Sequence, residues 1–214
     1  MNCIITAGPT FEPLDDVRRL TNFSTGRLGT ELANYLTARG HHVTLLVGES
    51  ATYAGKRRAQ TVKTFSTTAD LRAKLNALRG QKVDAIFHAA AVSDFVFGKM
   101  FVREASGKLK PFSPSKKIST RGGSLFVELV PTPKIIAELR GWFPKTKIVG
   151  WKFEADGGRS DALQAATRQL ADCATDFCVA NGPAYGQGFN LVSEDGKKHF
   201  ATAGKLFAAL ENLF

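Results

Sequence analysis

The sequence predicts an α/β fold of the Rossmann-like, three-layer type, in which helices cover both faces of a mostly parallel sheet. Apolar segments rich in β-branched residues alternate along the chain with segments of helical periodicity, which is typical of repeated strand–helix units. Near the C-terminus, two short segments flank Glu194-Asp195-Gly196, and an Asp-Gly turn of this kind predicts a hairpin.

Seven short apolar runs bounded by polar or turn-forming residues are predicted to be strands. They are Cys3–Ala7, His42–Val47, Gln60–Phe65, Val83–His88, Ser124–Leu129, Lys147–Lys152 and Asp176–Ala180. The C-terminal hairpin is expected to pair Asn190–Val192 with Lys198–Thr202.

Four segments repeat their apolar residues at helical spacing. They are Thr25–Ala38, Thr68–Leu78, Pro133–Leu139 and Asp161–Asp172, and a short helix is expected to run to Phe214. Gly40 lies just beyond the first of these helices, where glycine favours helix termination.

The stretch from Phe97 to Gly123 follows neither period and is rich in lysine, serine, glycine and proline. Long loops in compact domains are usually functional or disordered. We therefore expect a flexible flap over about residues 97–123 that carries lysines. No internal repeat or linker interrupts the chain, so residues 1–214 are expected to form a single domain.

The composition indicates an anionic partner. The chain has 29 Lys and Arg against 19 Asp and Glu, a formal net charge of +10. These basic residues are scattered and no nucleic-acid module is visible, which favours phosphorylated small molecules over nucleic acid. No run of eighteen apolar residues and no leader are present, so we expect a cytoplasmic protein outside the membrane. The three cysteines and four histidines lack the spacing of disulfide or metal sites.

The polar segment Thr21–Gly29 leads directly into the first predicted helix. A helix N-terminus attracts anions through its unpaired N–H groups and its dipole. Asn22 adds an amide to this turn and Arg27 adds a positive charge, while Ser24 and Gly26 keep it small and polar. We expect the turn to bind phosphate and to orient a reacting group.

Three further segments are candidate binding elements. Ala89–Phe95 follows the fourth predicted strand, at the sheet edge where α/β folds bind ligands. Asp94 in this segment could bind hydroxyl groups or a metal. The alternative is a tightly packed strand–helix corner in which Asp94 caps the helix. Lys117 lies late in the expected flap, where a lysine can close over a polyphosphate. Pro133–Ile136 begins another predicted helix, whose N-terminus is a second possible anion site. Trp151 lies at the end of a predicted strand, where its ring either stacks on a base or packs in the core.

An NAD(P)-binding oxidoreductase of the Rossmann type is a weaker alternative. Gly8 is followed only much later by Gly26 and Gly29, which breaks the dinucleotide fingerprint, although Glu49 follows the second strand. The Tyr-x-x-x-Lys pair of short-chain reductases is absent. A non-catalytic nucleotide- or nucleic-acid-binding module is the other alternative, suggested by the charge.

Taken together, seven segments in order make the chain resemble phosphopantothenate–cysteine ligase, of the family historically called DNA/pantothenate metabolism flavoprotein. They are Ile5–Thr10 with Glu12–Asp15, Thr21–Gly26, Ala89–Phe95, Lys117–Ser119, Thr132–Ile136, Val149–Glu154 and Asp176–Asn181. The resemblance spans essentially the whole chain.

The resemblance implies a homodimer that joins 4′-phosphopantothenate to cysteine in coenzyme A biosynthesis, using CTP or ATP with Mg²⁺. It implies that the substrate carboxylate attacks the α-phosphate to form an acyl-nucleotidylate, which the amine of cysteine then attacks. Lys117-Ile118-Ser119-Thr120 stands where bacterial fused enzymes commonly have Lys-x-Lys-Lys, so the choice between CTP and ATP stays open. The flavin-binding decarboxylase half has no counterpart here, so neither FMN nor NAD(P) is expected.

The resemblance also implies roles for individual residues. Asn22 is expected to bind phosphopantothenate and the acyl intermediate, Lys117 to meet the triphosphate, and Asp94 to contribute to a magnesium site. The expected nucleotide-binding residues are Gly8, Ser24, Gly26, Arg27, Ala89, Ala90, Ala91, Asp94, Phe95, Lys117, Pro133, Lys134, Ile135, Ile136 and Trp151.

Overall fold

A central eight-stranded sheet dominates the computed structural model, which describes residues 1–104, 106–113, 117–119 and 123–213. Its strand order is β13-β12-β11-β10-β6-β1-β4-β5. Six strands are parallel, namely β1 (Asn2–Ala7), β4 (His42–Gly48), β5 (Thr61–Phe65), β6 (Ala85–His88), β10 (Lys147–Phe153) and β11 (Phe177–Asn181). The antiparallel hairpin of β12 (Phe189–Ser193) and β13 (Gly196–Phe200) completes one edge, which confirms the predicted hairpin.

Helices cover both faces of this sheet, as predicted. On one face, α1 (Arg27–Ala38) and α5 (Ala203–Glu211) pack side chains such as Leu32 and Leu206 into a shared core. On the other face lie α2 (Thr68–Asn76), α3 (Ile135–Trp142) and α4 (Arg159–Cys173). The three-layer α/β fold class is therefore confirmed.

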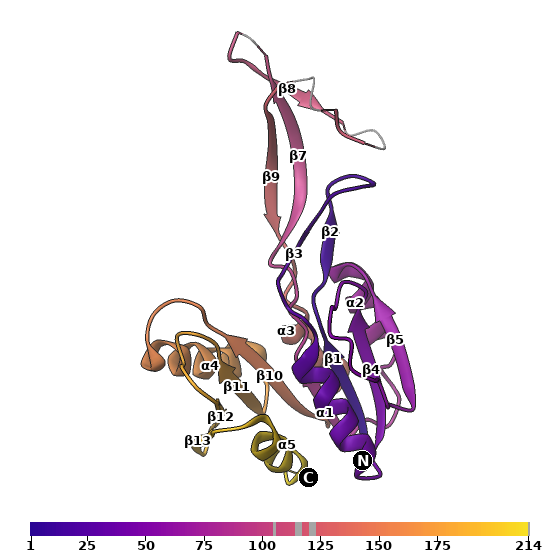
Figure 1. The fold of residues 1–214 in the computed structure, drawn as a ribbon, viewed down its shortest axis with the longest axis vertical. Coiled ribbons are helices and arrows are strands. Elements are labelled where there is room, and N and C mark those ends of the chain that lie inside the picture. The colour runs from indigo at the N-terminus through magenta and orange to yellow at the C-terminus, as the bar shows by residue number, and fades with distance from the viewer. Residues whose placement is uncertain (105, 114–116, 120–122, 214) are drawn as a thin grey trace.

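The segment predicted to be a flexible flap, residues 97–123, forms regular strands where it is described. An antiparallel sheet in the order β8-β7-β9 occupies this region, formed by β7 (Phe95–Arg103), β8 (Leu109–Phe112) and β9 (Leu125–Pro131). It rises away from the main sheet as an arm (Figure 1). A register shift between Phe97 and Met100 breaks the alternation of apolar and polar residues, which explains why the period was missed. Residues 105, 114–116 and 120–122 of the expected flap lie outside the described residues.

The strand expected at Ser124–Leu129 exists as β9, but it pairs in the arm and not in the main sheet. A second feature absent from the sequence analysis is a short ribbon of β2 (Phe11–Pro13) and β3 (Arg19–Thr21). It rises beside the arm and returns directly to Asn22 (Figure 1).

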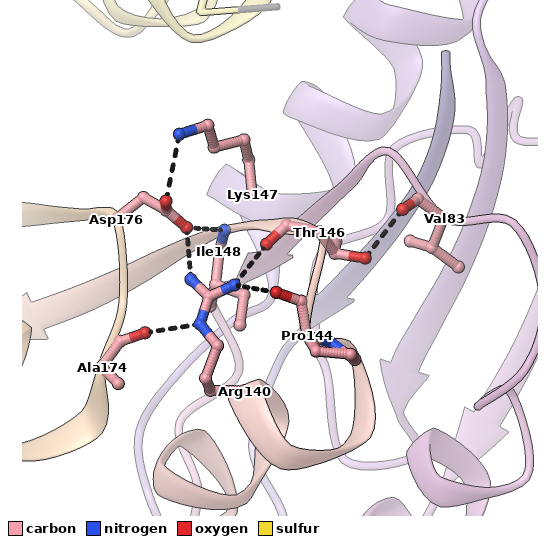
Figure 2. A network of polar contacts seen from close by, with 8 residues as sticks. All are labelled: Val83, Arg140, Pro144, Thr146, Lys147, Ile148, Ala174 and Asp176. Carbon is pink, nitrogen blue, oxygen red and sulfur yellow. Dashed lines mark hydrogen bonds and ion pairs between the residues drawn. The ribbon is translucent and has the colours of Figure 1, made fainter.

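At the amino ends of β10 and β11, Arg140 and Asp176 join α3 to the sheet (Figure 2). Asp176 accepts hydrogen bonds from Arg140 Nη2 at 2.6 Å, from the Ile148 amide at 2.8 Å and from Lys147 Nζ at 3.1 Å. Arg140 also donates to the backbone carbonyl oxygens of Pro144, Thr146 and Ala174. This network lies at the end of the sheet away from the ligand-binding edge described below.

We expect Asp176→Asn to lower the free energy of unfolding at pH 7 by about 1–3 kcal/mol, because three charge-assisted hydrogen bonds weaken. Burial acts to raise the pKa of Asp176, but the bonds from Ile148, Arg140 and Lys147 outweigh burial and lower it. With the folded-state pKa below the unfolded one, this stabilisation is complete above about pH 4 and is lost as the pH falls through the folded value. Urea unfolding at several pH values checks this.

The wild-type advantage over Asp176→Asn should therefore shrink as the solution becomes acidic. Asp172→Asn is the matched control, because Asp172 is exposed near the end of α4. An equal loss in both variants would contradict the assigned role of the network.

Candidate active site

The site lies where the strand order reverses. From β1 the chain proceeds to β4 and β5 on one side and returns to β6 on the other, so the connections after β1 and β6 diverge. Open α/β sheets bind ligands at this switch point, outside the carboxyl ends of the strands. Two adjoining cavities lie there, of about 390 and 620 Å³.

The smaller of the two, here called the helix cavity, lies at the N-terminus of α1. Ser24, Thr25, Gly26 and Arg27 line it. The N-cap residue Gly26 has no side chain to cap this helix, and of the first-turn amides that of Arg27 donates to Thr25 Oγ1 at 3.2 Å. Arg27 Nε donates to Glu31 Oε1 at 2.7 Å, which holds the guanidinium on the cavity wall. This geometry suits an anionic group.

Glycines shape the turn before α1. Gly26 has φ of +78°, and a Cβ there would lie 3.0 Å from Ala51 Cβ and 3.2 Å from Gly8 Cα. Gly8 has φ of +80°, and its Cβ would lie 2.8 Å from Ala51 Cβ. Ala51 thus fills the space immediately after β1, where a dinucleotide pyrophosphate would approach. Glu49 lines neither cavity. Both features disfavour the NAD(P) alternative.

The larger cavity, here called the crevice cavity, spreads across the carboxyl ends of β6 and β10 to the start of α3. Most of the candidate residues line one or both cavities. These are Asn22, Ser24, Gly26, Arg27, Ala89, Ala90, Ala91, Asp94, Pro133, Lys134, Ile135, Ile136 and Trp151. The linings do not include Gly8, Phe95 or Lys117.

The two cavities adjoin, and four residues line both. They are Ser24, Leu28, Ala89 and Asn181. A ligand that occupies both cavities would span from the α1 N-terminus to the residues of the crevice cavity that include Asn22 and Asp94.

Asn22 reaches the crevice cavity from the end of the β2–β3 ribbon. Its Nδ2 donates to the carbonyl oxygens of Ala91 at 3.2 Å and Val92 at 3.3 Å. These bonds are long, and the amide is exposed. A bound ligand can compete for the amide hydrogens, while Oδ1 remains available as an acceptor.

The segment after β6 is fixed by its own backbone. Ala89 N donates to Thr6 O, Ala91 N donates to Gly8 O, and Ser93 N donates to Thr10 Oγ1 at 2.8 Å. These bonds tie the small residues of the cavity floor to β1 and to the turn that follows it. The exposed Asp94 lies at the cavity rim.

His88, Gln169 and Asn181 are among the residues that line the crevice cavity and to which the sequence analysis assigned no role. His88 was assigned only to a buried strand, yet it is the last residue of β6, and this position at the carboxyl end was the available signal. Burial lowers the pKa of His88 to about 4, so the ring is neutral near pH 7. Gln169 comes from α4, and no local pattern marks it.

Lys117 lies outside these cavities, in a segment docked on the β2–β3 ribbon. The Ile118 amide donates to Asp15 Oδ2 at 3.0 Å, and Arg18 Nη2 donates to Ile118 O at 2.6 Å. The pKa of Asp15 is lowered to about 2, chiefly by the hydrogen bond from the Ile118 amide. The hydrogen bonds from the Val17 and Arg18 amides and the charge of Arg18 lower it further. Arg18 precedes Asn22 by four residues, roughly 13 Å of extended chain. Lys117 is thus docked on the ribbon and lines neither cavity of its own chain.

Among the described residues, no group of three or more His, Cys, Asp or Glu side chains is placed to hold a metal ion. Asp94 is the predicted metal ligand in the cavity lining, and its role stays a prediction. Within the described ranges, no helix combines the length and apolar character needed to cross a bilayer.

Residues 1–205 match the model of the DNA/pantothenate metabolism flavoprotein C-terminal domain. The coenzyme A biosynthesis bifunctional protein CoaBC of Thermococcus kodakarensis is 33% identical over 178 residues, covering 83% of this chain and 40% of that protein. The chain spans half or less of the length of its first curated relatives.

Solved structures share the fold over nearly the whole chain. The DNA/pantothenate metabolism flavoprotein of Streptococcus pneumoniae superposes with a TM-score of 0.84 at 25% identity, covering 99% of this chain and 97% of that one. A Cab2 H337A complex with phosphopantothenate-cysteine has a TM-score of 0.70 at 22% identity, covering 94% and 80%. At that identity, the second likeness shows the fold alone.

Proposed function

Since this chain belongs to the DNA/pantothenate metabolism flavoprotein C-terminal domain family, we propose that it ligates 4′-phosphopantothenate to L-cysteine at the expense of a nucleoside triphosphate. The membership confirms the resemblance found in the sequence. Relatives named as bifunctional enzymes of coenzyme A biosynthesis, and a fold neighbour solved with phosphopantothenate-cysteine, support this choice of substrates.

The proposed reaction has two steps. A carboxylate oxygen of phosphopantothenate attacks the α-phosphorus, forming an acyl-nucleotidylate and releasing pyrophosphate. The amine of cysteine then attacks the acyl carbon, loses a proton and expels the nucleoside monophosphate, forming the amide.

The observation that carries this proposal is that the two cavities adjoin, with Ser24, Leu28, Ala89 and Asn181 lining both. The α1 N-terminus supplies N–H groups and a positive dipole for the phosphates. The crevice cavity supplies Asn22 for the acyl group. The two reacting groups can therefore meet between the helix end and Asn22, which a two-step transfer through one intermediate requires.

We further propose that Mg²⁺ accompanies the triphosphate, with Asp94 as its carboxylate ligand, and that either CTP or ATP serves as the nucleotide. A homodimer is proposed from the apolar side chains that the ribbon, the arm and the site entrance expose. Val17 is 62% exposed, Leu129 48% and Phe23 fully exposed. We propose that a second copy covers these side chains, because contiguous exposed apolar patches are commonly covered at protein interfaces.

A coupled pyrophosphate assay tests the function. With phosphopantothenate, cysteine, Mg²⁺ and either CTP or ATP, we expect one pyrophosphate per phosphopantothenoylcysteine, the latter measured by mass spectrometry. No pyrophosphate release together with NADPH binding would favour the oxidoreductase. Salt-dependent binding to random DNA without turnover would favour the non-catalytic module.

A further inference from the structure

Four residues from four neighbouring strands lie in register on the sheet face covered by α3 and α4. Thr6 on β1 pairs with His88 on β6, His88 pairs with Gly150 on β10, and Gly150 pairs with Cys178 on β11. Adjacent strands are about 4.8 Å apart, so the side chains of this row are immediate neighbours. The row lies beneath the part of the crevice cavity near the start of α3.

One tautomer of the neutral His88 ring gives the buried Thr6 hydroxyl an acceptor. Thr6 Oγ1 accepts the Ala90 amide at 3.1 Å and lies 3.0 Å from His88 Nδ1. Thr6 is fully buried, so its hydroxyl hydrogen needs an acceptor, and within the described residues Nδ1 is the one within reach. Nδ1 therefore accepts, and the neutral ring carries its proton on Nε2. His88 is 5% exposed and lines the crevice cavity.

Gln169 reaches down from α4 into the space that Gly150 leaves. A Cβ on Gly150 would lie 2.3 Å from Gln169 Nε2, which places the amide beside His88 in the row. Nε2 donates to Cys178 Sγ at 3.2 Å. Burial raises the pKa of Cys178 to about 12, so the sulfur stays a neutral thiol. In the described part of the chain, Oε1 has no hydrogen-bond partner, and Gln169 lines the cavity.

We propose that His88 Nε2–H and Gln169 Oε1 together recognise the edge of the nucleobase, selecting a ring-nitrogen acceptor next to an exocyclic amino donor. Cytosine presents this pair at N3 and N4, and adenine presents it at N1 and N6. The apolar residues Ile135 and Ile136 lie on the same cavity wall and suit the ring faces. This inference rests on the proposed function for the identity of the ligand as a nucleotide.

The same pair disfavours uracil and guanine. Uracil has an N–H at position 3 and an oxygen at position 4, and guanine likewise has N1–H and O6. Either base would set donor against donor and acceptor against acceptor. Leaving both protein groups unpaired is expected to weaken binding about tenfold or more.

The test measures dissociation constants by calorimetry for CTP, UTP, ATP and GTP with Mg²⁺, and pyrophosphate release with each. If the natural base is cytosine, we expect wild-type protein to bind CTP at least about tenfold more tightly than UTP. If the natural base is adenine, we expect it to bind ATP at least about tenfold more tightly than GTP. Gln169→Met, which removes the acceptor at similar size, should reduce the preference to within about threefold. Gln164→Met, on the exposed side of α4, is the matched control and should preserve it.

His88→Leu provides the second variant, with the melting temperature reporting its fold, and should also collapse the preference. Equal binding of all four nucleotides by wild type, no nucleotide binding, or an unchanged preference in a folded Gln169→Met variant would overturn the inference. Turnover with all four nucleotides at the same rate would support the proposed ligase activity and refute the proposed base recognition. Selective binding without pyrophosphate release would refute the ligase and retain the base recognition.

Discussion

Replacing Asn22 with aspartate is expected to slow amide formation by about 100- to 1,000-fold. The wild-type amide donates to Ala91 O and Val92 O, and a carboxylate in its place would direct oxygen at both carbonyl groups. It would also bring negative charge to the acyl group, where the attack of an amine creates an oxyanion. The second step of the proposed reaction should therefore suffer most.

Single-turnover experiments separate the two steps for Asn22→Asp. Pyrophosphate release should persist while the amide forms slowly, so that the acyl-nucleotidylate accumulates and can be trapped and identified by mass. Asn76→Asp makes the same change on the exposed end of α2 and should leave both steps unaffected. If Asn22→Asp ligates at the wild-type rate, Asn22 has no role in the reaction.

Much of the fold could be predicted because its rules are local. Six of the seven predicted strands lie in the main sheet, since buried parallel strands form short apolar runs that stand out from their flanks. The turn before α1, which we propose binds an anion, was visible because the N-terminus of a helix and its glycine are adjacent in the sequence. The resulting position of Asn22 and Ala89–Asp94 at one edge follows from parallel topology alone.

The arm and the row beneath the crevice cavity could not be predicted in this way. The bulge between Phe97 and Met100 shifts the alternation of β7, so that neither period survives over the whole strand. Gln169 meets His88 only because α4 crosses over Gly150, a position lacking a side chain. That contact depends on strand register and on helix placement, and neither is encoded within a local window.

We expect Lys117→Gln to slow pyrophosphate release by about 100-fold, because a cation next to the polyphosphate stabilises the charge that develops during transfer. The melting temperature should stay near that of the wild type. Docking of this segment uses the Ile118 backbone, Asp15 and Arg18, and the substitution leaves all of them intact. Lys108→Gln, at another exposed lysine of the arm region, is the control. Unchanged pyrophosphate release would show that Lys117 takes no part in nucleotidyl transfer.

Lys117 lines neither cavity of its own chain, and this makes a stronger test possible if the protein is a homodimer. The test asks whether Lys117 serves the crevice cavity of the second copy. If it does, mixing Asn22→Asp with Lys117→Gln subunits should restore about a quarter of wild-type activity. Half of the dimers are then mixed, and one of the two sites in each mixed dimer is intact. If each lysine instead acts within its own chain, no mixed dimer gains an intact site and the mixture stays as inactive as its components.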